Sequence, residues 1–272
     1  MTERQERNKE AVINEIVDNL TLMDDDLMSK VFDRNIPATR LLLRTILGRD
    51  DIEVISAVGQ EELQSPIVGG RKIRLDIVAM DKTGAISDIE VQRQKAGAYP
   101  KRARLHSSML DSRMLKEGEE FQKLRDSYTI FITEKDYYKE GLPLYTIERQ
   151  IKENGRGFDD GSHIIYVNGD YDGEDAIGKL MKDFKCKNAE DMYYPELAEG
   201  VKHFKEEEGR DGMCEAVEQY ARMYAADIKA ENEKLEAENE KLEAEKEKVE
   251  AEKEKVEAEN ERLREELAKL KK

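Results

Sequence analysis

The segment 71–94 constrains the fold most, because apolar and polar residues alternate along it on both sides of a short break. A period of two is typical of β-strands with one buried face. The sequence therefore predicts a β-hairpin with its apolar side chains toward the core and its polar side chains facing away. The apolar set is Ile73, Leu75, Ile77, Ala79, Ile89 and Val91, and the polar set is Arg74, Asp76, Asp88, Glu90 and Gln92.

The break contains Lys82-Thr83-Gly84, which has the length of a common hairpin loop. Three-residue loops often end with a glycine in the left-handed conformation, which forms a bulge. A loop over these three residues fixes the pairing of the strands. It sets Asp81 opposite Ala85, Asp76 opposite Glu90, and Arg74 opposite Gln92.

The predicted pairing brings two carboxylates together. Directly opposed residues have Cβ atoms roughly 4.5–5.5 Å apart, and like charges at that distance repel. A bound cation would remove the repulsion between Asp76 and Glu90, and Mg²⁺ or Mn²⁺ takes carboxylate oxygens readily. A metal-bound water suits phosphodiester hydrolysis. The alternative is that both residues are ordinary solvated positions on the outer face of an edge hairpin.

Asp76, followed after thirteen residues by Glu90-Val91-Gln92, resembles the metal-binding signature of the PD-(D/E)XK nuclease superfamily. The Glu-x-Gln form is similar to its transposase-associated, recombination-promoting branch. The resemblance covers roughly residues 20–220 and implies a central mixed sheet flanked by helices. Four further segments carry it: Asp25 to Met28 with Phe32, in the pattern of that branch's first helix; Arg104 to Phe121; Ile164 to Gly169; and Leu180 to Phe184.

The resemblance also implies roles for individual residues. Asp76 and Glu90 would bind the metal, with the Val91 carbonyl as a further ligand. Asp25, in the first helix, would hold or orient the metal and its water, although neighbouring acidic residues compete for that role. Gln92 stands where the superfamily usually has lysine, and a neutral amide orients water without adding charge, so we expect weaker electrostatic stabilisation. The competing residues near Asp25 are Glu15, Asp24 and Asp26.

Charge is distributed unevenly along the chain. The net charge of −16 argues against attraction of nucleic acid by the whole surface. The segment 71–104 nevertheless carries nine basic and four acidic residues. We expect part of this cluster to contact DNA phosphates, the alternative being a solvated helix face. The candidate DNA-binding residues are Arg74, Arg93, Lys95, Lys101, Arg102 and Arg104.

The order of predicted elements gives an α/β fold. Helices are expected over 10–20, 25–34 and 37–47, then a strand over 52–58, the hairpin, and a helix over 99–116. Strands over 128–133, 144–148 and 163–167 follow. Residues 174–227 read as helical, with a break at 209–212, and either brace the core or carry a partner surface.

The last 45 residues repeat an apolar residue every seven positions without Gly or Pro, which predicts a long helix. We expect a parallel coiled-coil homodimer that is weak, because polar a positions cost stability and the glutamate-rich flanks repel each other. A solitary charged helix, a zipper with a basic partner and a solubilising tail are the alternatives. The chain thus divides into a nuclease-like domain over 1–187, a helical extension over 188–227 and a coiled coil over 228–272. The repeated residues are Ile228, Leu235, Leu242, Val249, Val256, Leu263 and Leu270.

The few cysteines and histidines and the lack of long apolar runs indicate the cellular compartment and limit the possible chemistry. Two cysteines, Cys186 and Cys214, without metal-type spacing indicate a reducing compartment, and no apolar run reaches the roughly 18 residues of a membrane helix. We expect a cytoplasmic protein. The three histidines are scattered, so no histidine-based cluster is expected, and only His106 falls near the hairpin.

The sequence therefore predicts a Mg²⁺- or Mn²⁺-dependent DNA endonuclease linked to recombination or mobile elements. Gln92 and the negative net charge favour the first alternative, an inactive nuclease fold that serves DNA binding or assembly. A host-defence or toxin nuclease would use the same chemistry.

Overall fold

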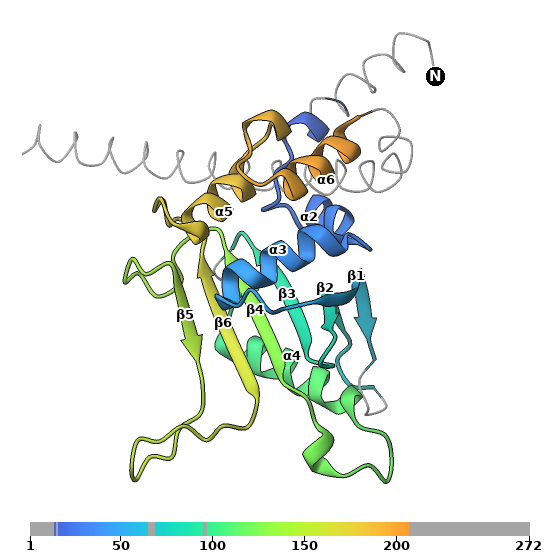
Figure 1. The fold of residues 1–272 in the computed structure, drawn as a ribbon, viewed down its shortest axis with the longest axis vertical. Helices are drawn as coiled ribbons and strands as arrows, with labels where there is room; N and C mark the ends of the chain where they lie inside the picture. The colour runs from blue at the N-terminus through green and yellow to red at the C-terminus, as the bar shows by residue number, and fades with distance from the viewer. Residues whose placement is uncertain (1–13, 15, 65–68, 95–96, 207–272) are drawn as a thin grey trace, which may run out of the picture. The chain divides into compact units, whose positions relative to one another are not determined.

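The computed structural model describes residues 14, 16–64, 69–94 and 97–206. They form a six-stranded mixed sheet with helices on both faces, as Figure 1 shows. The strands are β1 (Val54–Leu63), β2 (Ile73–Asp81), β3 (Ile86–Gln92), β4 (Ser127–Thr133), β5 (Leu144–Ile147) and β6 (Ser162–Asn168). The helices are α2 (Asp25–Phe32), α3 (Ile36–Leu47), α4 (Pro100–Met114), α5 (Ala176–Lys185) and α6 (Pro195–Lys205), with short 3₁₀ turns η2 (Phe121–Lys123) and η3 (Ala189–Asp191).

The strand order is β1-β2-β3-β4-β6-β5. β2 pairs antiparallel with both β1 and β3, and β5 pairs antiparallel with β6, whereas β3, β4 and β6 are parallel. A parallel pair needs a long crossover, and α4 lies in the one between β3 and β4. Because α4 returns across the sheet, its side chains come to lie over the end of β3.

The two faces of the sheet are covered by different helices. α2 and α3 pack on β1, with α2 also reaching β2 and β3, and α4 packs on β3, β4 and β6. In Figure 1 α3 lies in front of the sheet and α4 behind it. α6, within the segment predicted as a helical extension, packs against α2 and α3 and braces the core.

The hairpin has the predicted pairing. Gly84 has φ of +85°, and the ladder joins Ile77 to Ile89 and Met80 to Ile86. The amide of Asp81 donates to the Ala85 carbonyl at 3.1 Å. The loop glycine therefore sets the register as the turn chemistry predicts.

The expectation that the polar face of the hairpin points away from the core is wrong. Asp76 is 6% exposed and Asp88 and Glu90 are 0% exposed. The reason is tertiary, since Arg102 and His106 of α4 cover Glu90 and Asp88, and Asp76 lies between the separating strands against the Val91 amide. Of the predicted polar set, Arg74 alone has a mainly exposed side chain.

The other predicted strands and helices are present with shifted ends, but the segment predicted as helical from residue 174 is interrupted at 186–194, between α5 and α6. The predicted helix at 37–47 begins one residue earlier, because Asn35 caps it by accepting from the Ala38 amide at 3.2 Å. The first predicted helix is described only from residue 14 on. The break at 209–212 and the coiled coil at 228–272 lie outside the described residues.

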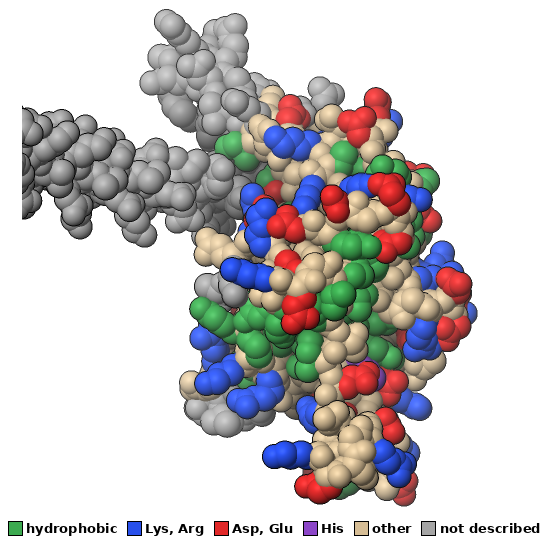
Figure 2. Space-filling model, turned by 90° about the vertical axis from the view of Figure 1, so that its left-hand side faces the viewer, with side chains coloured by type: hydrophobic (Ala, Val, Ile, Leu, Met, Phe, Trp, Pro, Cys, Tyr) green, Lys and Arg blue, Asp and Glu red, His purple; other side chains and the backbone are tan. Residues whose placement is uncertain are grey.

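Figure 2 shows the face of the molecule on the β5 side. Acidic and basic side chains are mixed on it, around a group of hydrophobic side chains. The net negative charge therefore does not make this face uniformly acidic. None of the helices in the described part of the chain combines the length and apolar character that a membrane span requires.

Candidate functional site

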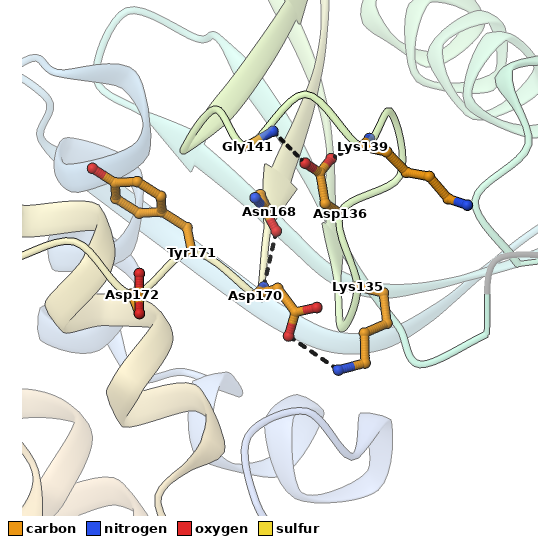
Figure 3. Close-up of a pocket in the computed structure, with 8 residues that line it drawn as sticks. All are labelled: Lys135, Asp136, Lys139, Gly141, Asn168, Asp170, Tyr171 and Asp172. Carbon is orange, nitrogen blue, oxygen red and sulfur yellow. Dashed lines mark hydrogen bonds and ion pairs between the residues drawn. The ribbon is translucent and has the colours of Figure 1, made fainter.

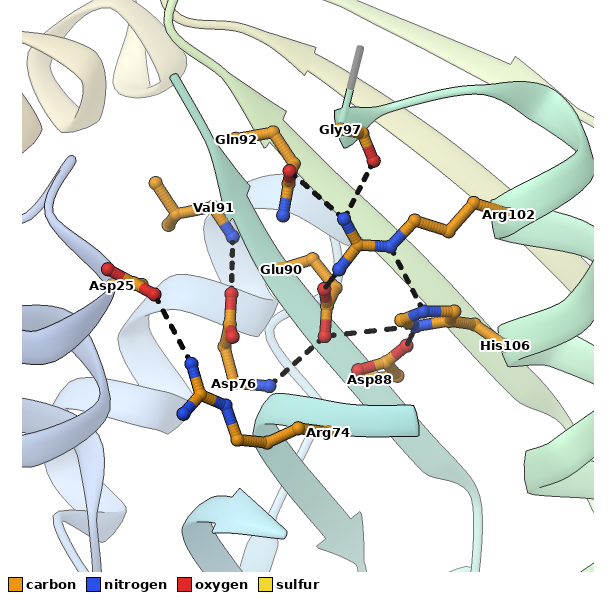
Figure 4. A network of polar contacts seen from close by, with 10 residues as sticks. All are labelled: Asp25, Arg74, Asp76, Asp88, Glu90, Val91, Gln92, Gly97, Arg102 and His106. Atoms are coloured by element: carbon orange, nitrogen blue, oxygen red, sulfur yellow. Dashed lines mark hydrogen bonds and ion pairs between the residues drawn. The ribbon is translucent and has the colours of Figure 1, made fainter. Parts of the chain in front are cut away.

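Asp76 and Glu90 meet where the ladder between β2 and β3 ends. One residue beyond the Ile77–Ile89 pair, side chains replace the backbone contacts, as Figure 4 shows. The Asp76 amide donates to Glu90 Oε1 at 3.0 Å, and the Val91 amide donates to Asp76 Oδ2 at 3.1 Å. The two carboxylates thus lie beside each other between the separating strand ends.

Burial makes these carboxylates reluctant to ionise. Desolvation raises the pKa of Asp76 to about 6, with the charge of Asp25 adding to it and the Val91 amide opposing it. Burial also raises the pKa of Glu90 well above its usual range, helped by the charges of Asp88 and Asp76. A cation held between them would stabilise the ionised forms.

Asp25 approaches the pair from the start of α2. Its Oδ2 lies 3.6 Å from Nη2 of Arg74, an exposed ion pair beside Asp76. Asp24 is instead buried against Arg93, whose Nη1 lies 2.6 Å from its Oδ1, and the pKa of Asp26 is raised by burial and by Asp25. Of the described acidic residues that compete for the role, Asp25 is the one whose charge acts on Asp76. The last competitor, Glu15, lies outside the described residues.

Gln92 lies at the end of β3 and contacts α4. Its Oε1 accepts from Nη1 of Arg102 at 3.1 Å. Nη2 of the same guanidinium donates to Glu90 Oε2 at 2.6 Å. Arg102, predicted as a phosphate contact, therefore lies inside the carboxylate network.

The sequence did not predict two further residues of this network, Asp88 and His106. Asp88 and His106 are both buried, and Asp88 Oδ2 lies 2.8 Å from His106 Nδ1, which is itself 3.8 Å from Glu90 Oε1. Asp88, Glu90 and His106 could together hold a metal ion, contrary to the expectation that histidine joins no cluster. The signal was present, because Asp88 is two residues before Glu90 on one strand face and His106 is one helical turn after Arg102.

The remaining candidate DNA-binding residues spread around this centre. Arg93 is half exposed and also lies 3.8 Å from Glu134, in addition to its pair with Asp24. Lys101 and Arg104 are exposed on α4. Arg74 is exposed beside Asp25. Lys95 lies outside the described residues.

A separate pocket of about 620 Å³ lies near the carboxyl ends of β4 and β6. Figure 3 shows Asp136 and Asp170 among its lining residues. Asp136 accepts from three backbone amides and from the Tyr145 hydroxyl, so it holds its own loop together. None of the predicted site residues lines this pocket.

A mixed sheet flanked by helices, with paired carboxylates where two central strands separate, defines an α/β protein with a candidate metal-dependent hydrolytic centre. A family model described as PD-(D/E)XK nuclease family transposase matches residues 32–171. The match covers more than half of the chain, and the chain belongs to this family. The resemblance read from the sequence is thereby confirmed. The matched residues include Asp76, Glu90, Gln92 and Arg102, whereas Asp25 precedes them. Comparison with curated proteins and with solved structures gave no match.

Proposed function

We propose that the protein is a Mg²⁺- or Mn²⁺-dependent DNA endonuclease that serves recombination or mobile elements. The observation that carries this proposal is the buried pair of Asp76 and Glu90, whose carboxylates each accept a backbone amide of the neighbouring strand where the ladder stops. Family membership supports nuclease chemistry. The exposed basic residues Lys101 and Arg104 support DNA as the substrate.

The donor set fits a hard divalent cation. Carboxylate oxygens are the ligands that Mg²⁺ and Mn²⁺ prefer, and burial raises the pKa of both Asp76 and Glu90, so a bound cation would favour their ionised forms. The Asp88–Glu90–His106 cluster shares Glu90 but is almost completely buried. We therefore assign the metal to the Asp76 side, where the half-exposed Asp25 and Arg74 leave an approach for phosphate.

In this proposal Asp76 and Glu90 hold the metal, with the Val91 carbonyl as a further ligand. The bound metal would lower the pKa of a coordinated water and stabilise charge on the phosphate. With the metal bound, Asp25 on α2 would orient that water, and the Gln92 amide at the end of β3 would hydrogen-bond to it. Arg74 and Arg93, with Lys101 and Arg104 on α4, position the DNA backbone.

Plasmid nicking tests the proposal. The wild type should nick DNA with Mg²⁺ or Mn²⁺, and EDTA should abolish nicking. Asp76→Ala and Glu90→Ala should each lose about 10²-fold or more in rate, because each removes a charged group on which the reaction depends. Glu190→Ala, an exposed carboxylate in η3, is the matched control and should cleave like the wild type. Wild-type nicking by either site variant would overturn the assignment.

A second candidate function is a non-catalytic DNA-binding or assembly module. Gln92, which stands where lysine is usual, favours it. It predicts DNA binding without metal-dependent cleavage at any enzyme concentration. An electrophoretic mobility shift beside the nicking assay separates the two functions.

A further inference from the structure

Gln92 provides no positive charge at a position where the proposed nuclease needs one. An amide donates and accepts hydrogen bonds but carries no net charge. Developing negative charge on a phosphate is best stabilised by a fixed cation or by preorganised donors. The residues near Gln92 therefore decide whether the site contains such a cation.

Arg102 brings a guanidinium to the Gln92 amide. The guanidinium spans the two site residues of β3, with Nη1 on Gln92 Oε1 and Nη2 on Glu90 Oε2. Nη1 also donates to the Gly97 carbonyl at 2.9 Å. The cation thus lies at the end of the Gln92 side chain and beside Glu90, as Figure 4 shows.

The loop before α4 is shaped to allow this contact. A Cβ on Gly97 would lie 1.7 Å from Gln92 Oε1, so a larger residue here would push the Gln92 amide out of this position. The close approach places the Gly97 carbonyl beside Arg102. Loop and helix therefore fix the guanidinium from one side.

Asp88 and His106 hold the guanidinium from the other side. Nε of Arg102 can only donate, so His106 Nε2, 3.2 Å away, is the acceptor. Because Nε2 accepts from Arg102, the ring proton lies on Nδ1, which donates to Asp88 Oδ2 at 2.8 Å. The guanidinium carbon also lies 5.7 Å from the centre of the Phe131 ring.

The held guanidinium keeps access to a ligand. Among the described residues, its contacts use four of the five N–H donors that an arginine carries, and the fifth is on Nη2. The side chain is 36% exposed, whereas Glu90 is completely buried. A phosphate oxygen can therefore reach the same nitrogen that binds Glu90.

We propose that Arg102 is a catalytic residue that supplies, from α4, the positive charge that Gln92 lacks, with Asp88 and His106 as its positioning residues. This inference rests on the proposed nuclease function. Arg102 contacts the phosphate as negative charge develops on it, and Gln92 orients the water. The superfamily's usual lysine would both orient the water and supply the charge. Here Gln92 on β3 takes the first role and Arg102 on α4 takes the second.

Single-turnover cleavage of plasmid DNA by the full chain tests the inference. Arg102→Gln should lower the rate by about 10²- to 10³-fold, as loss of a charge-stabilising donor does. KM and the Mn²⁺ affinity from calorimetry should change less than about threefold, because Asp76 and Glu90 remain. Gln92→Lys in the Arg102→Gln background should restore at least tenfold of the loss, since it returns a cation to the same place.

Controls separate this role from a structural one. Arg113→Gln, on the same helix but paired with Glu61, should cleave like the wild type. If Arg102→Gln does not fold by circular dichroism, Arg102→Lys keeps the charge without the fork and should retain part of the rate. A folded Arg102→Gln that cleaves within threefold of the wild type, or a Gln92→Lys change that restores nothing, overturns the inference while the nuclease stands. Absence of cleavage by the wild type overturns the proposed function and this inference with it.

Discussion

At the residue scale, the carboxylates of the candidate site reduce the stability of the folded protein. Burial raises the pKa of Asp76, Asp88 and Glu90. One oxygen of Asp88, Oδ1, is buried without a hydrogen-bond partner among the described residues. Such a concentration of desolvated charge is typical of functional centres, where stability is given up for activity.

Replacing Asp76 should therefore stabilise the metal-free protein. The folded pKa of about 6 exceeds the usual 3.8, so the stability contribution of this group is full below about pH 4 and is lost as pH rises through 6. Asp76→Asn stays neutral and can still accept from the Val91 amide. Its free energy of unfolding should exceed that of the wild type by about 3 kcal/mol at about pH 8, and by less than about 1 kcal/mol at about pH 4.

Thermal unfolding in EDTA at the two pH values measures this difference. Glu190→Gln, an exposed carboxylate, should stay within about 0.5 kcal/mol of the wild type at both. An Asp76→Asn protein that is less stable than the wild type at the higher pH would contradict the role of desolvation.

At the element scale, the hairpin turn sets the register that joins the two carboxylates. Asp81 accepts from the Thr83 and Ala85 amides, which shapes the loop, and Gly84 adopts the left-handed conformation. A β-strand shifted by one residue presents its other face. A wrong register would therefore separate Asp76 from Glu90.

Gly84→Ala should destabilise the protein. A side chain in the left-handed region costs about 1–2 kcal/mol, and the new Cβ would also approach Arg125 Cγ to 3.3 Å. Lys82→Ala, in the same loop, should change stability by less than about 0.5 kcal/mol. Urea unfolding of both variants gives the comparison, and equal midpoints would exclude a requirement for glycine.

At the scale of the whole molecule, self-association is predicted from the tail at 228–272 and not from the folded domain. The heptad repeat over 228–272 predicts self-association that the core does not require. Replacing Leu235 and Leu242 together by Asn should convert a dimer to a monomer, because the repeat predicts both in the apolar seam. The repeat predicts Ala237 and Ala244 on the outer face, so their joint replacement by Asn should leave the mass unchanged.

Light scattering after size-exclusion chromatography of the full chain measures the oligomeric state. A monomeric wild type would exclude the homodimer and leave the solitary helix, a foreign partner or a solubilising tail. A dimer that survives both leucine replacements would place the contact elsewhere.

Local chemistry made much of the fold predictable. The alternation and Gly84 gave the hairpin and its register, and propensity located the central helices and strands to within a few residues. β1 extends to Leu63, beyond the predicted end, because an edge strand tolerates the polar residues Gln60, Glu61 and Glu62. The prediction ended this strand at residue 58 because the residues after it are mostly polar.

The sequence by itself determined the opposed carboxylates and the family, because strand period, turn geometry and motif spacing act over short stretches of chain. Only the tertiary structure decided that the polar face is buried and that Arg102 and His106 reach it. Those contacts join residues 12 and 18 positions apart. They arise because the crossover through α4 passes back over β3, and no local pattern specifies which side of the sheet a crossover covers.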